Sequence, residues 1–314
     1  MMKEFKLSVF SALAASRRTR LVVASCLAIV LYITGPLNAS AEQRAFGVGV
    51  GSQYTTTHVY VEPEDVDAFV RCFLATFGGQ STKQLVATLT PTPSKTTTQL
   101  LQTPSGTVSL FGFKTPIPWP FGRERTGYLV ADIGMAEKSA VAAGADVLVA
   151  PFDDPIGKDM VIEWPGGVDM QLYWHNIPPK YEPFANIPED RVYVSPVRID
   201  DFLRSYLSFS GGRVMADDAA SPGVQVGRPD QTFRRILIHS VFGEMVINVT
   251  DGHLPFPYGR EKTGYKVPEL AAAISRATAN GANVLDGPYR SSGRDVALVR
   301  FPGGYIAEMH ASAE

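Results

Sequence analysis

The sequence predicts an α+β fold in which two copies of one domain follow each other along the chain. Two observations lead to this prediction. The first is an internal repeat: residues 118–128 (PWPFGRERTGY) recur as 255–265 (PFPYGREKTGY), and residues 164–167 (WPGG) recur as 301–304 (FPGG). The second is a regular order of strand-like and helix-like segments inside each copy. A repeat this long indicates duplicated domains rather than a solenoid of short repeats.

The same strand and helix signals occur twice in each copy, in the order β-α-β-β-β. In the first copy, residues 58–61 alternate as a strand, and residues 64–77 have apolar side chains at helical spacing up to Gly78. Strand-like segments follow near 84–90, 97–102 and 107–113. A second unit begins with a strand at 127–131, a helix at 134–143, and a hairpin of 159–163 with 168–174. In the second copy, the same pattern predicts helices near 199–209 and 268–279.

These signals place the first domain at 55–175 and the second at 191–314, each with its own core. Residues 176–190 form a proline-rich linker, and residues 42–54 form a flexible, glycine-containing lead-in. Residues 1–41 have a basic start, an apolar run and a small-residue end, which is typical of a signal peptide. The sequence therefore predicts a periplasmic or secreted protein with no membrane span after cleavage. An uncleaved N-terminal anchor is the alternative.

Composition and charge limit the kinds of molecule that the protein is expected to bind. The formal net charge is −2, and residues 1–41 carry five basic side chains against one acidic, so the remaining chain is more acidic. A mildly acidic chain without a basic patch does not favour nucleic-acid binding. Cys72 is the single cysteine after residue 41, so no intrachain disulfide is expected. The expected partners are a small-molecule ligand or substrate and, within the chain, the other domain.

The repeated motifs resemble the vicinal oxygen chelate superfamily, which includes glyoxalase I, extradiol dioxygenases and bleomycin-resistance proteins. The resemblance rests on the His58-Val59 strand opening, the mid-domain strand and helix, and the closing Pro-Gly-Gly turn of each copy. It implies two glyoxalase-like domains, each with two βαβββ units in a curled mixed sheet around a cleft. It also implies a divalent metal held by imidazole and carboxylate ligands, in an open geometry that activates oxygen-bearing substrates.

At the positions that correspond to the family's metal ligands, both copies depart from the pattern. The first copy has His58, then Arg125 and Gln171 in place of a histidine and a glutamate. The second copy has Arg191 and Lys262, and only Glu308 matches. A divalent metal therefore has an incomplete ligand set in either copy. The set that remains for a metal consists of His253, Glu308 and His310.

The repeated Gly-Arg-Glu-x-Thr-Gly-Tyr segment supplies further candidate residues. Its guanidinium groups suit a carboxylate or vicinal oxygens, and its carboxylates suit general-base catalysis. The predicted catalytic residues are Glu124, Glu261 and Glu308. The predicted ligand-binding residues are Arg123, Tyr128, Arg260, Tyr265, Gln171 and His58. The alternative is that this segment is a salt-bridged scaffold loop that the fold needs in every copy.

The sequence thus predicts an exported glyoxalase-like protein that binds or acts on a small oxygenated molecule in a cleft. A lyase or a dioxygenase is the expected type of enzyme, if the protein is one. The alternative is a non-catalytic protein that binds or sequesters a small molecule, as bleomycin-resistance proteins do.

Overall fold

The computed structural model describes residues 47–313, so the predicted signal peptide lies outside the described residues. The first sheet has nine strands, in the order β2-β4-β5-β1-β6-β9-β8-β7, with β3 paired to β4. These strands are β1 (Thr56–Val61), β2 (Gln80–Ser81), β3 (Leu85–Ala87), β4 (Thr96–Thr103), β5 (Gly106–Phe113), β6 (Thr126–Leu129), β7 (Asp146–Asp154), β8 (Gly157–Trp164) and β9 (Val168–His175).

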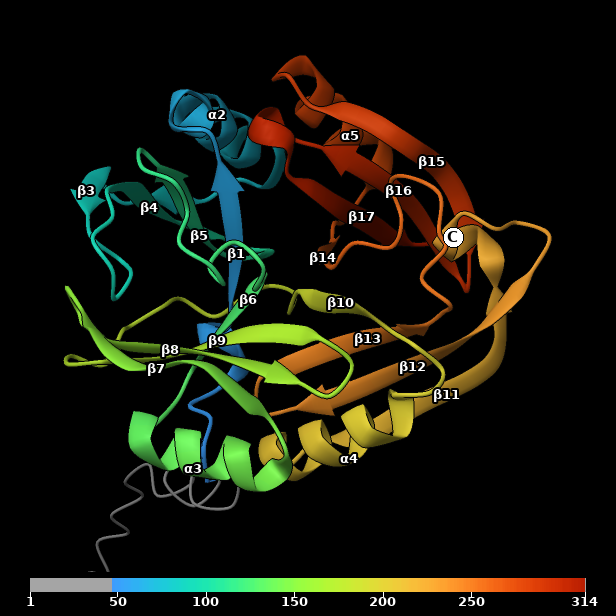
Figure 1. Cartoon of the computed structure of the whole chain (residues 1–314). Helices are drawn as coiled ribbons and strands as arrows, with labels where there is room; N and C mark the ends of the chain where they lie inside the picture. The colour runs from blue at the N-terminus through green and yellow to red at the C-terminus, as the bar shows by residue number, and fades with distance from the viewer. Residues whose placement is uncertain (1–46, 314) are drawn as a thin grey trace, which may run out of the picture.

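The second sheet repeats this topology with eight strands, in the order β11-β12-β13-β10-β14-β17-β16-β15. These are β10 (Glu189–Val194), β11 (Arg213–Pro222), β12 (Thr232–Ser240), β13 (Gly243–Val249), β14 (Lys262–Lys266), β15 (Asn283–Ser291), β16 (Arg294–Arg300) and β17 (Ile306–Ser312). In both sheets the opening strands of the two units pair antiparallel, β1 with β6 and β10 with β14. Each sheet is mixed and curls around a concave face (Figure 1).

In residues 47–313, four α-helices cover the outer faces: α2 (Val66–Phe77), α3 (Ile133–Ala143), α4 (Ile199–Ser210) and α5 (Leu270–Ala279). Local chemistry sets their ends. The Asp132 side chain caps α3 by accepting a hydrogen bond from the amide of Met135 at 2.7 Å. Gly144 ends the same helix with φ 97°, a left-handed conformation that favours glycine. The helices form two pairs, α2 with α5 and α3 with α4 (Figure 1).

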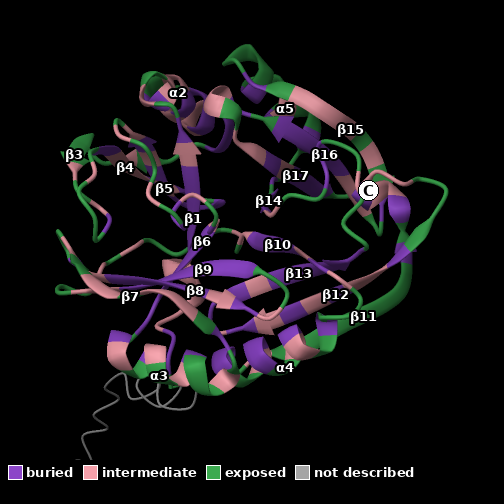
Figure 2. Ribbon diagram, in the orientation of Figure 1, coloured by how far each residue is buried: buried purple, intermediate pink, exposed green. Residues whose placement is uncertain are grey.

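Each hydrophobic core contains residues from both domains, which corrects the expectation of one core per domain. One core joins the second half of the first domain to the first half of the second, for example Trp164 and Met170 with Tyr206 and Ile236. The other joins the remaining halves, with Phe73 of α2 beside Tyr265 of β14 and the residues of α5. Figure 2 shows this as buried faces on the paired helices and the strands beneath them.

The segments outside the two sheets also pack against them. Residues 42–54 were predicted to be flexible, but the described part pairs with the end of β6 and with the residues that follow it: the amide of Val50 donates to the carbonyl of Leu129 at 3.1 Å. Val48 is buried in the first core. The linker returns over the first domain, where the amide of Ala185 donates to the carbonyl of Pro104 and Tyr181 contacts Tyr54. Both segments therefore pack against the first domain and form hydrogen bonds with it.

Candidate functional site

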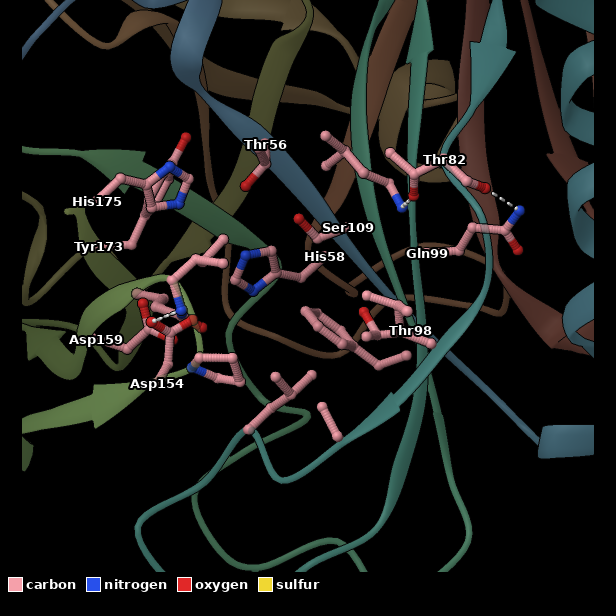
Figure 3. A pocket seen from close by; sticks show the side chains of 18 of the residues that line it. Thr56, His58, Thr82, Thr98, Gln99, Ser109, Asp154, Asp159, Tyr173 and His175 are labelled. Atoms are coloured by element: carbon pink, nitrogen blue, oxygen red, sulfur yellow. Dashed lines mark hydrogen bonds between the residues drawn. The ribbon is translucent and has the colours of Figure 1, made fainter. Parts of the chain in front are cut away.

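The concave face of the first sheet holds a cavity of about 320 Å³. Its floor consists of side chains that alternate along β1, β5, β8 and β9 and point away from the core. Figure 3 shows His58 and Ser109 near the centre, with Asp159, Tyr173 and His175 on one side and Thr98 and Gln99 on the other. Apolar residues form much of the remaining wall: Leu85, Ala87, Leu89, Leu100, Phe111, Pro155 and Ile156. A concave, mainly apolar site with a few polar groups is the usual form of a small-molecule site.

His58 lines the cavity, and behind it lie two side chains that do not line it, Glu124 and Tyr60. Glu124 is fully buried, and its Oε1 accepts a hydrogen bond from the Tyr60 hydroxyl. The same oxygen lies 3.7 Å from His58 Nδ1. His58 Nδ1 and Glu124 Oε2 have no hydrogen-bond partner among the described residues. Two predicted site residues, His58 and Glu124, are therefore brought together, whereas Tyr60 was missed because its strand position looked structural.

Asp159 is a second buried acid of the cleft, and the sequence reasoning also missed it. It lies on β8 opposite Tyr173 of β9. Burial raises the pKa of Asp159 well above its ordinary value, and the Asp154 charge raises it further, while a hydrogen bond to Gln171 acts in the opposite direction. Burial therefore favours the neutral carboxyl of Asp159, which can donate a hydrogen bond. The sequence offered little signal for it, because the same strand also carries a second acidic residue, Glu163.

The repeated Thr-Gly-Tyr of each copy has a structural role. A Cβ on Gly127 would lie 2.5 Å from His58 Nε2, and one on Gly264 would lie 2.7 Å from the Arg191 guanidinium. Glycine thus leaves room for the cleft side chain of the neighbouring strand. The next residue points to the opposite face: Tyr128 and Tyr265 are buried in the two cores. Their burial in the cores does not favour the predicted role of these tyrosines in ligand binding.

The arginines of the repeated segment also lie outside the cavities. Arg123 is 47% exposed, and it pairs with Asp169 at 2.8 Å and with Glu163 at 3.4 Å. Arg260 is exposed, and its guanidinium carbon lies 5.9 Å from the centroid of the Phe256 ring. Neither lines a described cavity of the clefts. The alternative of a scaffold loop fits both arginines better than the predicted ligand clamp.

The second cleft is largely filled by its own charges. The Arg191 guanidinium lies 2.6 Å from Glu308 and 2.7 Å from Glu189, and Arg294 lies 2.7 Å from Glu189. Burial acts to raise the pKa of Glu308, but Arg191 and His310 outweigh it and lower that pKa. Lys262 donates to the Tyr193 hydroxyl at 2.8 Å, and burial lowers its pKa to about 7. Glu308 therefore has a fixed cationic partner, which does not favour the predicted role of catalytic base.

Glu261 lies between the two domains and lines none of the described cleft cavities. Burial raises its pKa well above the ordinary value, and the nearby Asp190 charge adds to this, while Arg125 acts in the opposite direction. Asp190 in turn accepts a hydrogen bond from the Thr126 hydroxyl at 3.0 Å across the domain interface. The position of Glu261 favours a role in the contact between domains over the predicted role in the second cleft.

The donor set does not fit the divalent metal that this kind of fold implies. At the corresponding positions of the first cleft, His58 is joined by a guanidinium and an amide, from Arg125 and Gln171. In the second cleft, the Arg191 guanidinium takes the place beside Glu308. Glu308 and His310 are 3.3 Å apart, but His253 is exposed in a loop after β13. Among residues 47–313, no three histidine, cysteine or acidic side chains gather to hold a metal, so the set predicted at His253, Glu308 and His310 does not form.

Comparison with solved structures identifies the fold. A variant of 4-hydroxymandelate synthase from Streptomyces coelicolor is similar over 83% of this chain and 93% of its own, with a TM-score of 0.55 and 13% identity. Homoprotocatechuate 2,3-dioxygenase from Arthrobacter globiformis is similar over 85% and 82%, with a TM-score of 0.54 and 13% identity. A Mn(II)-bound glyoxalase from Novosphingobium aromaticivorans is similar over 84% and 83%, with a TM-score of 0.50 and 15% identity.

The chain therefore has the vicinal oxygen chelate fold with two tandem domains, and the predicted fold class is confirmed. No family model and no curated protein matches the sequence. At identities this low, the structural likeness defines the fold and leaves the activity to the site residues. Within residues 47–313, none of the helices has the length and apolar character that crossing a membrane requires.

Proposed function

We propose that the first domain binds a small, mainly apolar molecule that carries oxygen atoms, and that hydrogen bonds from the cleft hold those oxygens. One observation carries the proposal: the cavity of about 320 Å³ combines apolar walls with His58, Asp159 and Gln171 on its floor. Residues 1–41 support the further proposal that this binding takes place in an exported protein.

The polar groups of the floor suit a hydroxyl, carbonyl or carboxylate oxygen. The neutral form of the Asp159 carboxyl, which burial favours, donates a hydrogen bond, and the Gln171 amide both donates and accepts. A buried donor in an apolar cleft discriminates strongly between ligands, because a ligand without the matching oxygen leaves that donor unpaired. Phe111 and Tyr173 offer flat surfaces on opposite sides of the floor, which favours a ring-shaped ligand.

The His58 and Glu124 pair favours a second candidate function, an enzyme that moves a proton on the bound molecule. A histidine next to a buried carboxylate is the arrangement by which proteins orient an imidazole for acid–base work. The 3.7 Å between His58 Nδ1 and Glu124 Oε1 is close enough to become a hydrogen bond after a small shift. Lyase or isomerase chemistry of this kind would use His58, which lines the cavity, with Glu124 behind it.

Fragment screening by crystallography tests the proposal without assuming a ligand. We expect small aromatic alcohols and acids, with catechol and benzoate in the set, to gather in the first cleft with an oxygen near Asp159 or Gln171. Asp159→Ala should weaken their binding about tenfold or more in solution, since a buried hydrogen bond is lost. Arg123→Ala is the matched control, because Arg123 lies outside the cleft. Fragments that avoid the first cleft, or equal losses in both variants, would refute the proposal.

A further inference from the structure

The second cleft retains a cavity of about 120 Å³ on its concave face. This volume is well above the ~10–15 Å³ that one water molecule needs. Three guanidinium groups line it, and each comes from a different strand: Arg191 from β10, Arg235 from β12 and Arg294 from β16. The other lining residues are Gln225, Tyr289, Ser291, Ser292, Val296 and Glu308.

The charges around this cavity do not balance. Arg191 and Arg294 share the carboxylates of Glu189 and Glu308. The Arg235 guanidinium makes no hydrogen bond or ion pair with the residues that the structure describes. Burial and the charges of Arg191 and Arg294 lower the pKa of Arg235, and the more distant charges of Glu189 and Glu308, which make no ion pair with it, oppose this only in part. Because arginine stays protonated in proteins, the cavity keeps one cation that no described ion pair compensates.

Hydroxyl donors complete the lining. The Gln225 amide donates to Ser291 Oγ and to Ser292 Oγ, each at 2.9 Å. Because both serine oxygens accept these bonds, their hydroxyl protons are free to point at a ligand. Ser291 is buried at the end of β15, and Ser292 follows in the turn to Arg294. Guanidinium forks and hydroxyl groups together match the geometry of an oxyanion.

The first cleft lacks this arrangement at the equivalent positions. In the first sheet, Phe111 pairs with Tyr60 on one side and with Thr98 on the other. In the second sheet, Asn248 pairs in the same way with Tyr193 and Arg235. The position of Arg235 is therefore equivalent to that of Thr98. The repeat also relates Val296 of the second cleft to Asp159 of the first, through the equivalent pairs Leu298–Glu308 and Val161–Gln171. One cleft is thus apolar with a buried acid, and the other is cationic.

We propose that the second cleft binds a small oxyanion, either the carboxylate of an organic acid or an inorganic phosphate, between Arg235, Arg294 and the hydroxyls of Ser291 and Ser292. The anion compensates the charge of the Arg235 guanidinium. It also offsets the repulsion between Arg235 and the two neighbouring arginines, Arg191 and Arg294. This site is distinct from the proposed ligand site of the first domain, and the proposal does not depend on that function.

Isothermal titration of the full chain with inorganic phosphate and, separately, with acetate tests this proposal. Sodium chloride holds the ionic strength constant, so that general screening does not change between injections. We expect saturable binding of at least one anion to one site. Binding of phosphate alone identifies the phosphate source, and binding of acetate identifies an organic-acid carboxylate.

Arg235→Gln should weaken the binding at least tenfold. Arg234→Gln is the matched control: it makes the same charge change one residue away, on the opposite face, where Arg234 pairs with Asp217 at 2.7 Å. Thermal unfolding checks that both variants are folded, and Ser292→Ala provides a second, smaller perturbation of the site. The proposal is overturned if neither anion binds saturably, if Arg235→Gln binds as the wild type does, or if both arginine variants lose affinity equally.

Discussion

Glu124 and Glu261 occupy equivalent places in the two copies of the repeat, yet their surroundings differ. Glu124 accepts the Tyr60 hydroxyl and faces His58 in the first cleft. Glu261 lies at the domain interface near Asp190. The residue types were visible in the sequence, and the strong internal match suggested equal roles. Their roles diverge because the residues around them differ: His58 and Tyr60 in one case, and Asp190 with Arg125 in the other.

The buried acids at the domain interface make stability depend on pH. Burial raises the pKa of Asp190 from 3.8 to about 6, and the hydrogen bond from Thr126 opposes this rise. Between these two pKa values, the folded chain holds a proton that the unfolded chain has released. The contribution of Asp190 to stability is therefore present below pH 3.8 and is lost as the pH rises through about 6.

We therefore expect the free energy of unfolding to rise when the pH falls from 7.5 to 5.5, with roughly 1 kcal/mol of the rise due to Asp190. Glu189, whose pKa of about 2 is lowered by Arg191 and other cations against the effect of burial, loses its contribution only at lower pH. Urea unfolding at both pH values measures the change. Asp190→Asn should remove the part due to Asp190 while keeping an acceptor for Thr126, and an unchanged pH dependence in that variant would contradict this assignment.

At the scale of elements, glycines in β6 and β14 let adjacent strands carry large cleft side chains. A Cβ on Gly127 would lie 2.5 Å from His58 Nε2, whereas a Cβ on Gly134 in α3 would meet only Asp132 Oδ1, at 3.5 Å. Gly127→Ala forces His58 to move in a packed site, and we expect a loss of about 1–3 kcal/mol in unfolding free energy.

Gly134→Ala is the control for this prediction, because it adds the same methyl group to a helix with room for it. We expect this control to leave stability unchanged or to raise it by about 0.5–1 kcal/mol, as alanine suits a helix better than glycine. Urea unfolding of the two variants provides the comparison. Equal stability of both variants would mean that Gly127 is not required by the packing of His58.

At the scale of the whole molecule, the two domains depend on each other for their cores. Trp164 packs against Tyr206 and Phe209 of α4, and Phe73 packs against Tyr265 of β14. Each domain alone would expose the apolar face that the other covers. With Cys72 as the one cysteine in the described residues, no disulfide there adds to this packing. Stability of the described chain thus rests on burial across the domain interface.

We expect separate fragments of residues 47–187 and 188–313 to lack cooperative unfolding and to bind a hydrophobic dye, because each lacks half of both cores. Mixing the fragments should restore a cooperative transition. Circular dichroism during thermal unfolding measures this. A cooperative transition in either fragment alone would show that one domain has a sufficient core of its own, and an intact chain with the same ends serves as the control.

The sequence by itself determined the α+β class, the tandem copies and the order of strands and helices. The strands and helices follow from local periodicity, and the tandem copies follow from the internal repeat, and both can be read without knowing the fold. The sequence also indicated that a metal would find an incomplete ligand set, since His58, Arg125 and Gln171 can be compared with a family pattern one residue at a time. Only the tertiary structure decided which face each residue occupies. Tyr128 and Tyr265 belong to the cores, Asp159 belongs to the first cleft and Arg235 to the second, because sheet curvature and domain pairing bring together residues that are distant along the chain.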